Sequence, residues 1–98
     1  MGNMAYQFGP FLIDPVAYRV LRGNETLELT PRVMDLLLIL IARPGMLVTK
    51  DALLEALWPN VNVTDNALTQ AVSELRHAIG DNSRTPRYIQ TVARRGYR

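Results

Sequence analysis

The pattern of hydrophobic and polar positions changes near residue 29. Before that point, short apolar and aromatic stretches (YQFG, FLID, YRVLR and TLEL) are separated by the turn-forming pairs Gly9-Pro10, Asp14-Pro15 and Gly23-Asn24. Such stretches bounded by turn residues are typical of strands, and Gly-Asn permits the positive φ of a hairpin turn. The first thirty residues therefore predict a small antiparallel sheet.

From Leu29 onward, one helix-entry pattern occurs three times, as LTPRVM, VTKDAL and VTDNAL. In each, a threonine (Thr30, Thr49 or Thr64) can accept hydrogen bonds from unpaired backbone N–H groups, and apolar residues on either side of this cap can pack together. Pro31 stands at the first helical position, where its missing N–H costs nothing. Three helix starts are predicted.

The expected helix ends agree with these starts. The first helix should stop before the sequence RPG, the second near Leu57 because a proline follows shortly, and the third at Ile79 with Gly80 as a left-handed cap. The final segment, RYIQTVARRGYR, is again strand-like, with a turn around residues 94–96. The sequence thus predicts an α+β fold: an N-terminal antiparallel sheet, three helices and a C-terminal β-hairpin.

Length and composition fit one domain over residues 1–98, with residues 1–4 as a disordered or non-native extension. Because the chain stops at Arg98, inside the last expected strand, we expect it to be excised from a longer protein. The absence of cysteine excludes disulfides and Cys-ligated metals. The longest apolar run, residues 36–42, is far short of the ~20 residues that cross a bilayer. We therefore expect no membrane contact by this domain and a cytoplasmic location.

Charge is unevenly distributed along the chain. Residues 1–75 carry a net charge of −3, whereas residues 76–98 carry six arginines and one acid, Asp81, for a net charge of +5. A strongly basic segment of this kind indicates an anionic partner, most often nucleic acid or a membrane surface. A merely basic tail is the competing interpretation at this point.

The third expected helix separates an apolar from a polar face. The apolar stripe, which must face the core, consists of Leu68, Val72, Leu75 and Ile79. The opposite, uncharged side consists of Asn66, Gln70, Ser73 and His77. Asn and Gln can pair bidentately with adenine in the major groove. By residue type alone, a plain polar surface helix is the simpler interpretation. The arginine-rich hairpin that follows favours a helix that contacts DNA bases.

Catalytic and metal chemistry find no support in the sequence. The carboxylates are scattered, Ser73 has no base-and-acid set, and no glycine-rich phosphate loop occurs. His77 is the only histidine and has no second metal-ligand candidate at a suitable spacing. We expect no enzyme activity, no cofactor and no metal.

Several motifs in combination resemble one known family. They are LTP before the first helix, RPG after it, LLEALWP in the second helix, ELRHAIGD at the end of the third, and GYR in the last strand. Together with the opening FGPFLIDPVAYRVLRGNETLEL, they resemble the OmpR/PhoB-type winged helix-turn-helix DNA-binding domain of bacterial transcription regulators, which belong to two-component-like signalling. The start of the chain is similar to the CadC/ToxR-like branch, in which the DNA-binding domain comes first.

This resemblance implies sequence-specific binding of double-stranded DNA, with the helix over about residues 65–79 in the major groove and the hairpin over about residues 88–98 as a wing at the minor groove. It implies base reading by Asn66, Thr69, Gln70 and Ser73. It implies contacts to phosphates or beside the wing by Arg76, His77, Arg87, Arg94 and Arg95. Two departures from the family pattern are Glu74 in the helix and Ala93 where many members carry the wing arginine.

Further partners also follow from the resemblance. The loop after the second helix, with Trp58, Asn60 and Asn62, would contact RNA polymerase, and a second copy would bind on tandem direct repeats. The alternative function is a winged-helix protein-interaction module that uses the loop over residues 58–63, which a net charge of only +2 leaves open. The arginines after Asp81 argue against it, because a protein-binding module gains nothing from them.

Overall fold

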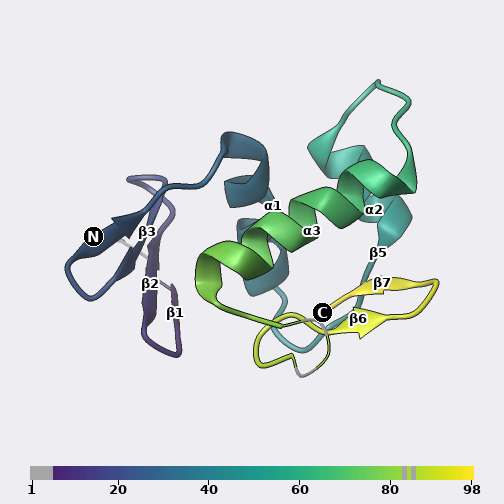
Figure 1. Cartoon of the computed structure of the whole chain (residues 1–98). Coiled ribbons are helices and arrows are strands. Elements are labelled where there is room, and N and C mark those ends of the chain that lie inside the picture. Colours follow the sequence, from purple (N-terminus) through teal and green to yellow (C-terminus); the bar gives the residue numbers. More distant parts are fainter. Residues whose placement is uncertain (1–5, 83, 85) are drawn as a thin grey trace.

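In the computed structural model, residues 6–82, 84 and 86–98 are described, so the prediction for residues 1–4 lies outside the described part (Figure 1). The N-terminal sheet is antiparallel with the strand order β1-β2-β3-β4, as predicted. Its strands are β1 Tyr6–Phe8, β2 Phe11–Asp14, β3 Arg19–Arg22 and β4 Glu25–Leu27. One face of this sheet is buried through Phe11, Ile13 and Val20.

Three helices follow, and their bounds match the predicted starts and stops: α1 Pro31–Ile41, α2 Lys50–Leu57 and α3 Asp65–Ile79. The Thr30 hydroxyl accepts from the Val33 N–H at 3.3 Å, and the Thr49 hydroxyl from the Ala52 N–H at 3.1 Å. Thr64 occupies the third N-cap position, but its side chain makes no capping hydrogen bond.

The core forms around α1, the central helix. Its buried residues are Val33, Met34, Leu36, Leu37 and Leu40. The stripe predicted for α3 is also confirmed, because none of Leu68, Val72, Leu75 and Ile79 is more than 3% exposed. Gly80 closes α3 in the left-handed conformation with φ +72°, also as predicted.

The C-terminal hairpin pairs with a strand before α2 that sequence reasoning missed. Strands β6 Thr91–Val92 and β7 Gly96–Tyr97 pair as expected, and β5 Val48–Thr49 completes a three-stranded sheet with the order β5-β7-β6. Gly96 permits this, because a Cβ atom added to it would lie 2.0 Å from the Val48 carbonyl oxygen. The wing is therefore fastened directly to the start of α2.

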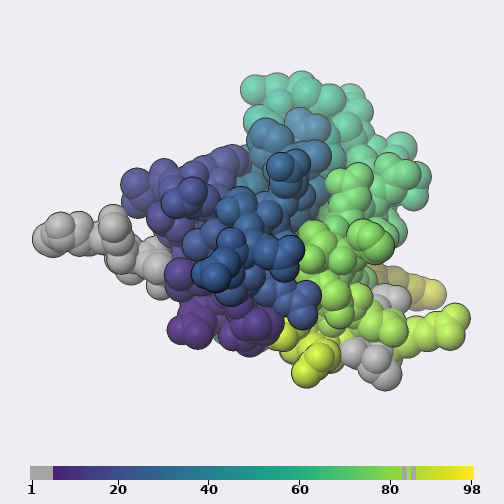
Figure 2. All heavy atoms as spheres, turned by 60° about the vertical axis from the view of Figure 1, so that its left-hand side comes forward, coloured from purple at the N-terminus to yellow at the C-terminus, as the bar shows by residue number. Residues whose placement is uncertain are grey.

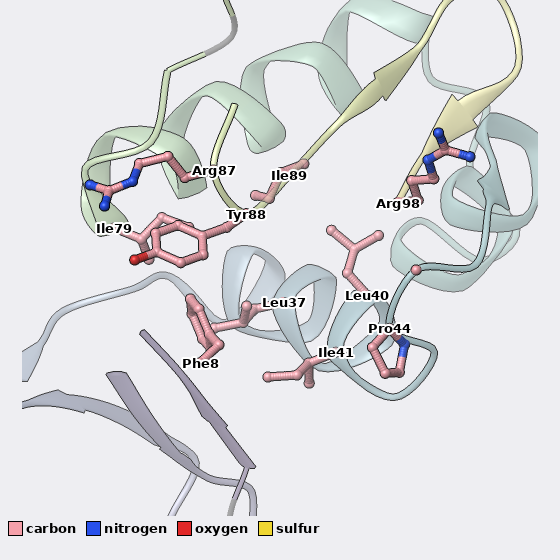
Figure 3. Close-up of a pocket in the computed structure, with 11 residues that line it drawn as sticks. Phe8, Leu37, Leu40, Ile41, Pro44, Ile79, Arg87, Tyr88, Ile89 and Arg98 are labelled. Atoms are coloured by element: carbon pink, nitrogen blue, oxygen red, sulfur yellow. The ribbon is translucent and has the colours of Figure 1, made fainter. Parts of the chain in front are cut away.

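An aromatic cluster joins the N-terminal sheet to the segment before the wing. The Tyr88 ring meets the rings of Phe8 and Phe11 edge-on, with centroids 5.2 and 5.9 Å away. Figure 3 shows Tyr88 and Phe8 at the rim of an apolar hollow that also involves Leu37, Leu40 and Pro44. Contacts between distant segments thus hold the base of the wing in place.

Candidate nucleic-acid interface

The polar face of α3 is accessible along its length. Its exposed residues include all those expected to read bases and also His77: Asn66, Thr69, Gln70, Ser73 and His77. In Figure 1, α3 crosses the molecule between the wing, which lies below it, and the segment joining α2 to α3, which lies above it. A helix in this position can enter a groove of a duplex while the wing and the segment joining α2 to α3 face the walls of that groove.

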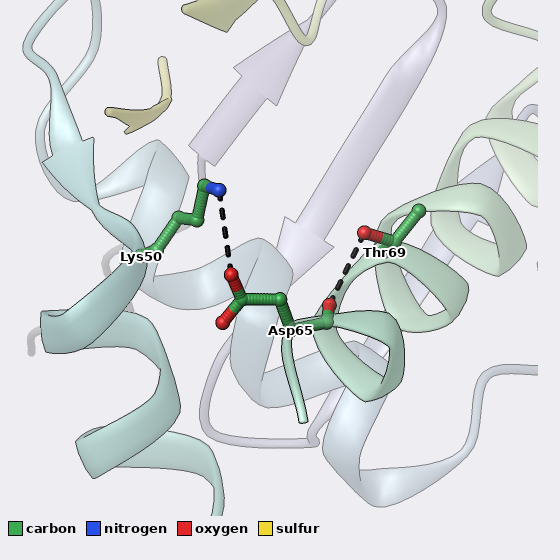
Figure 4. A network of polar contacts seen from close by, with 3 residues as sticks. All are labelled: Lys50, Asp65 and Thr69. Carbon is green, nitrogen blue, oxygen red and sulfur yellow. Dashed lines mark hydrogen bonds and ion pairs between the residues drawn. The ribbon is translucent and has the colours of Figure 1, made fainter. Parts of the chain in front are cut away.

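The N-terminal turn of α3 is fixed by polar contacts. Lys50 Nζ lies 3.5 Å from Asp65 Oδ2, and the Thr69 hydroxyl donates to the Asp65 carbonyl oxygen at 3.1 Å (Figure 4). Because its hydrogen is used within the helix, the Thr69 hydroxyl is left as an acceptor towards an outside partner. Lys50 lies beside the wing, and its backbone N–H donates to the Arg95 carbonyl oxygen at 3.0 Å.

The turn of the wing presents two arginines. Arg94 adopts a positive φ of +66°, and the Arg95 N–H closes the turn by donating to the Val92 carbonyl oxygen at 3.0 Å. The side chains of both residues are exposed. The hairpin thus holds two exposed cations at its tip, on a turn that is closed by a backbone hydrogen bond.

Arg76 points towards the wing. Its Nη2 donates to the Ile89 carbonyl oxygen at 2.9 Å and to the Thr91 hydroxyl at 2.8 Å, and its guanidinium lies 6.0 Å from the Tyr97 ring centroid. Its Nε is buried and has no partner within the described part of the chain. The structure makes Arg76 a link between α3 and the wing, whereas its expected contact with a phosphate stays a prediction.

Arg87 lies at the base of the hairpin, far from its tip. Figure 3 shows its side chain beside Ile79, where it is one of the residues that line the apolar hollow. The side chain is exposed, and its backbone N–H donates to Asp81 Oδ1 at 2.8 Å. The structure therefore does not bring Arg87 together with Arg94 and Arg95.

Asp81 organises the segment between α3 and the wing, a role that sequence reasoning missed. Its carboxylate accepts from four backbone N–H groups, those of Asn82, Arg87, Tyr88 and Ile89. Partial burial would by itself raise the pKa of Asp81, but these donors hold it below its usual value. The available sequence signal was the position of Asp81 directly after the helix cap, as the last acid of a basic segment.

Trp58 anchors the loop between α2 and α3. The ring is half-buried, and the Arg32 guanidinium lies 4.9 Å from its centroid. Beyond it the loop is open, because Asn60 and Asn62 are exposed and Val61 is 58% exposed. The expected contact of this loop with RNA polymerase remains a prediction.

Within residues 6–82, 84 and 86–98, no group of three or more metal-binding side chains comes together. In the same part of the chain, no helix has the length and apolar character to cross a membrane.

The sheet, the three helices and the hairpin define a winged helix-turn-helix domain. The family model described as "Transcriptional regulatory protein, C terminal" matches residues 23–98. The chain therefore belongs to this family, the OmpR/PhoB-type winged-helix domains of bacterial transcription regulators. The domains of this family are DNA-binding regulatory domains, and their fold is not a known enzyme fold.

Individual relatives agree with this assignment. The chain is 36% identical over 99 residues to the transcriptional activator CadC of Escherichia coli. This match covers all of this chain but only 19% of CadC. The Klebsiella pneumoniae RstA DNA-binding domain, solved in complex with the RstA box, has a TM-score of 0.83 and 34% identity over 95% of this chain and 93% of that one. The DNA-binding domain of E. coli CadC has a TM-score of 0.79 and 33% identity over 94% of this chain and 87% of that one.

Proposed function

We propose that this domain binds double-stranded DNA in a sequence-specific manner and thereby regulates transcription. The observation that carries the proposal is the exposed, uncharged polar face of α3 beside a hairpin whose tip presents Arg94 and Arg95. The likeness to a domain solved on its DNA box supports the same function for this fold. The protein would act in the cytoplasm, where its DNA lies.

In this proposal α3 lies in the major groove. The groove is about 12 Å wide and accepts one helix, and each base pair presents a distinct pattern of donors and acceptors there. Asn66, Gln70 and Ser73 stand on the exposed side and can donate and accept at base edges. Because these residues are uncharged, they supply selectivity, and the arginines supply most of the affinity.

The wing would contact the adjacent minor groove. A narrow minor groove carries an enhanced negative potential that attracts arginine. Ala93 cannot contribute a charge, so Arg94 and Arg95 at the tip take this role. Lys50 is held beside the wing by its backbone N–H, but its ammonium group is paired with Asp65.

Further contacts of the whole protein belong to the same proposal. The exposed loop with Asn60, Val61 and Asn62 is the surface offered to RNA polymerase. The exposed Val61 also supports the alternative, a protein-interaction module that uses the same loop. The two functions differ in one measurable property, which is whether binding of the isolated domain to DNA depends on base sequence.

Selection of bound sites from random duplex DNA by the isolated domain tests the proposal. We expect enrichment of a defined motif, and binding whose log K falls against log salt with a slope of roughly −4 to −5 for about 4–6 phosphates engaged. The double variant Arg94→Ala/Arg95→Ala should retain the motif but bind more weakly. Recovery of unenriched sequences, or binding that ignores salt, would favour the protein-interaction alternative.

A further inference from the structure

We propose that Arg32 of α1 is an additional phosphate-binding residue, placed on the flank of α3 opposite the wing. The inference rests on the proposed function, because it assumes that α3 enters the major groove. A helix with its side chains is 10–12 Å across, about the width of that groove, so both phosphate backbones pass close to its flanks. The wing supplies cations to the phosphate backbone on one flank, and the backbone on the other flank requires a cation from elsewhere in the fold.

The two flanks of α3 are distinct in the structure. Arg76 marks the wing flank through its hydrogen bonds to Ile89 and Thr91. Glu74 lies two positions earlier, which is about 200° around the helix, and faces a groove between α3 and the start of α1. The residues of α3 that line this groove are Ala67, Gln70, Ala71 and Glu74. The helix itself therefore offers no cation on this side.

Arg32 is the one basic residue among the described residues that line this groove. Figure 2 shows the blue start of α1 lying between the purple strands of the N-terminal sheet and the green helix α3, with the teal loop after α2 above them. Arg32 stands on the α1 wall, and Gln70, an expected base reader, stands on the facing wall of α3. A strand of DNA that reaches Gln70 thus passes the guanidinium of Arg32.

The side chain of Arg32 is held in advance. Its Nε donates to the Leu57 carbonyl oxygen at 3.2 Å, and its guanidinium stacks on Trp58. Neither of its terminal Nη groups has a hydrogen-bond partner in the described part of the chain, and the residue is exposed. A guanidinium fixed in this way loses little freedom on binding and presents a planar fork that matches a phosphate.

Two carboxylates share this groove and oppose an anion. Asp35 accepts a hydrogen bond from the Tyr18 hydroxyl, which ties it to the N-terminal sheet. Glu74 has no ion pair, since the one pair found in the described residues joins Lys50 and Asp65. The opposing charge of Glu74 restricts the phosphate to the Arg32 side of the groove, and Glu74→Gln should accordingly tighten binding.

The test compares Arg32→Met with Arg22→Met. Methionine keeps an apolar stem against the aromatic ring but removes the charge and the donors. Arg22 is a matched control, because it is also exposed and lies 5.8 Å from an aromatic ring centroid, that of Phe11 on the N-terminal sheet. Affinity is measured over a range of salt on a random-sequence duplex and on a selected site, with thermal unfolding of each variant as the check on folding.

We expect Arg32→Met to weaken binding about tenfold on both duplexes and to reduce the magnitude of the salt slope by about 1, with Arg22→Met unchanged. Arg32→Lys, which keeps the charge, should retain the slope. If Arg32→Met behaves like Arg22→Met while the wild-type domain binds DNA, the inference is wrong and the proposed function stands. A change of base preference in place of a uniform loss also overturns it. A wild-type domain that binds no duplex overturns both.

Discussion

Arg76 of α3 donates to the hydroxyl of Thr91 in β6 over 2.8 Å, so the helix expected to read bases is tied directly to the wing. The same nitrogen also donates to the Ile89 carbonyl oxygen. Two elements that must reach different grooves of one duplex are thereby held at a fixed spacing. This link matters for the proposed function, because it fixes the position of the wing relative to α3.

Removing this link should loosen the wing. Thr91→Val deletes one partner of a partly buried charged donor, and we expect a loss of about 1–2 kcal/mol of unfolding free energy. Amide exchange at Gln90 and Arg98, which donate to each other's carbonyl oxygens, should accelerate more than exchange in α1. Thr69→Val, whose hydroxyl bonds only within α3 among the described residues, is the control. Unchanged exchange in the wing would contradict the role given to Arg76.

Asp81 should make the wing sensitive to acid. Because its folded pKa lies below its unfolded one, its stabilising contribution is complete above the unfolded pKa and is lost as the pH falls through the folded pKa. We expect the free energy of unfolding of the wild type to decrease as the pH is lowered below about 4. The Asp81→Asn variant should be less stable than the wild type at neutral pH and should show a weaker pH dependence in the acidic range. Chemical denaturation across this range measures both. Parallel pH profiles for the two proteins would refute the assignment.

Gly96 should tolerate no side chain. A Cβ atom there would meet the Val48 carbonyl oxygen at 2.0 Å and Thr49 Cα at 2.8 Å, so Gly96→Ala must separate β7 from β5. We expect a destabilisation of at least about 1–3 kcal/mol, as for overpacking of a core. Gly23→Ala is the comparison, because it has the strain of a φ of +62° but no atom within 4 Å of the added Cβ. Equal losses for the two variants would show that steric closeness at Gly96 is unimportant.

Substitutions in α3 and in the wing should impair DNA binding in different ways. Gln70→Ala should relax preference at one base position and cost about 1–3 kcal/mol against the preferred site. Arg94→Ala together with Arg95→Ala should weaken binding to all sequences, and most of all to sites with A/T-rich flanks. Competition binding on a set of single-base variants of a selected site separates the two patterns. A uniform loss of affinity in the Gln70 variant would remove α3 from its reading role.

The free domain should be a monomer that binds direct repeats. A single small domain on one site buries little surface, so its binding should be weak, and a second copy about one helical turn away, at ~10–11 base pairs, would let the two touch. Sedimentation of the free domain, followed by titration of DNA with one and two repeats, measures both properties. A stable dimer without DNA, or equal affinity for one and two repeats, would exclude this arrangement.

The sequence by itself determined the local elements of this protein. Pro31 after a capping threonine, the glycine at position 80 and the apolar stripe of α3 act over one or two turns of chain, so their effect can be deduced from neighbouring residues. The exposed side of α3 follows from the same periodicity, because a helix that buries Leu68 and Leu75 must turn Gln70 outward. Local periodicity thus fixed which residues the helix presents.

Only the tertiary structure decided how these elements are joined. Val48 pairs with Tyr97, a contact between residues far apart in the chain that no local signal encodes. Spacing placed Arg76 on a flank of α3, but the neighbouring wing decided that its guanidinium turns inward. Likewise, nothing in LTPRVM indicates that Arg32 stacks on Trp58, because that contact depends on how α1 packs against the end of α2. A long side chain can reach several partners, and packing between distant segments selects one of them.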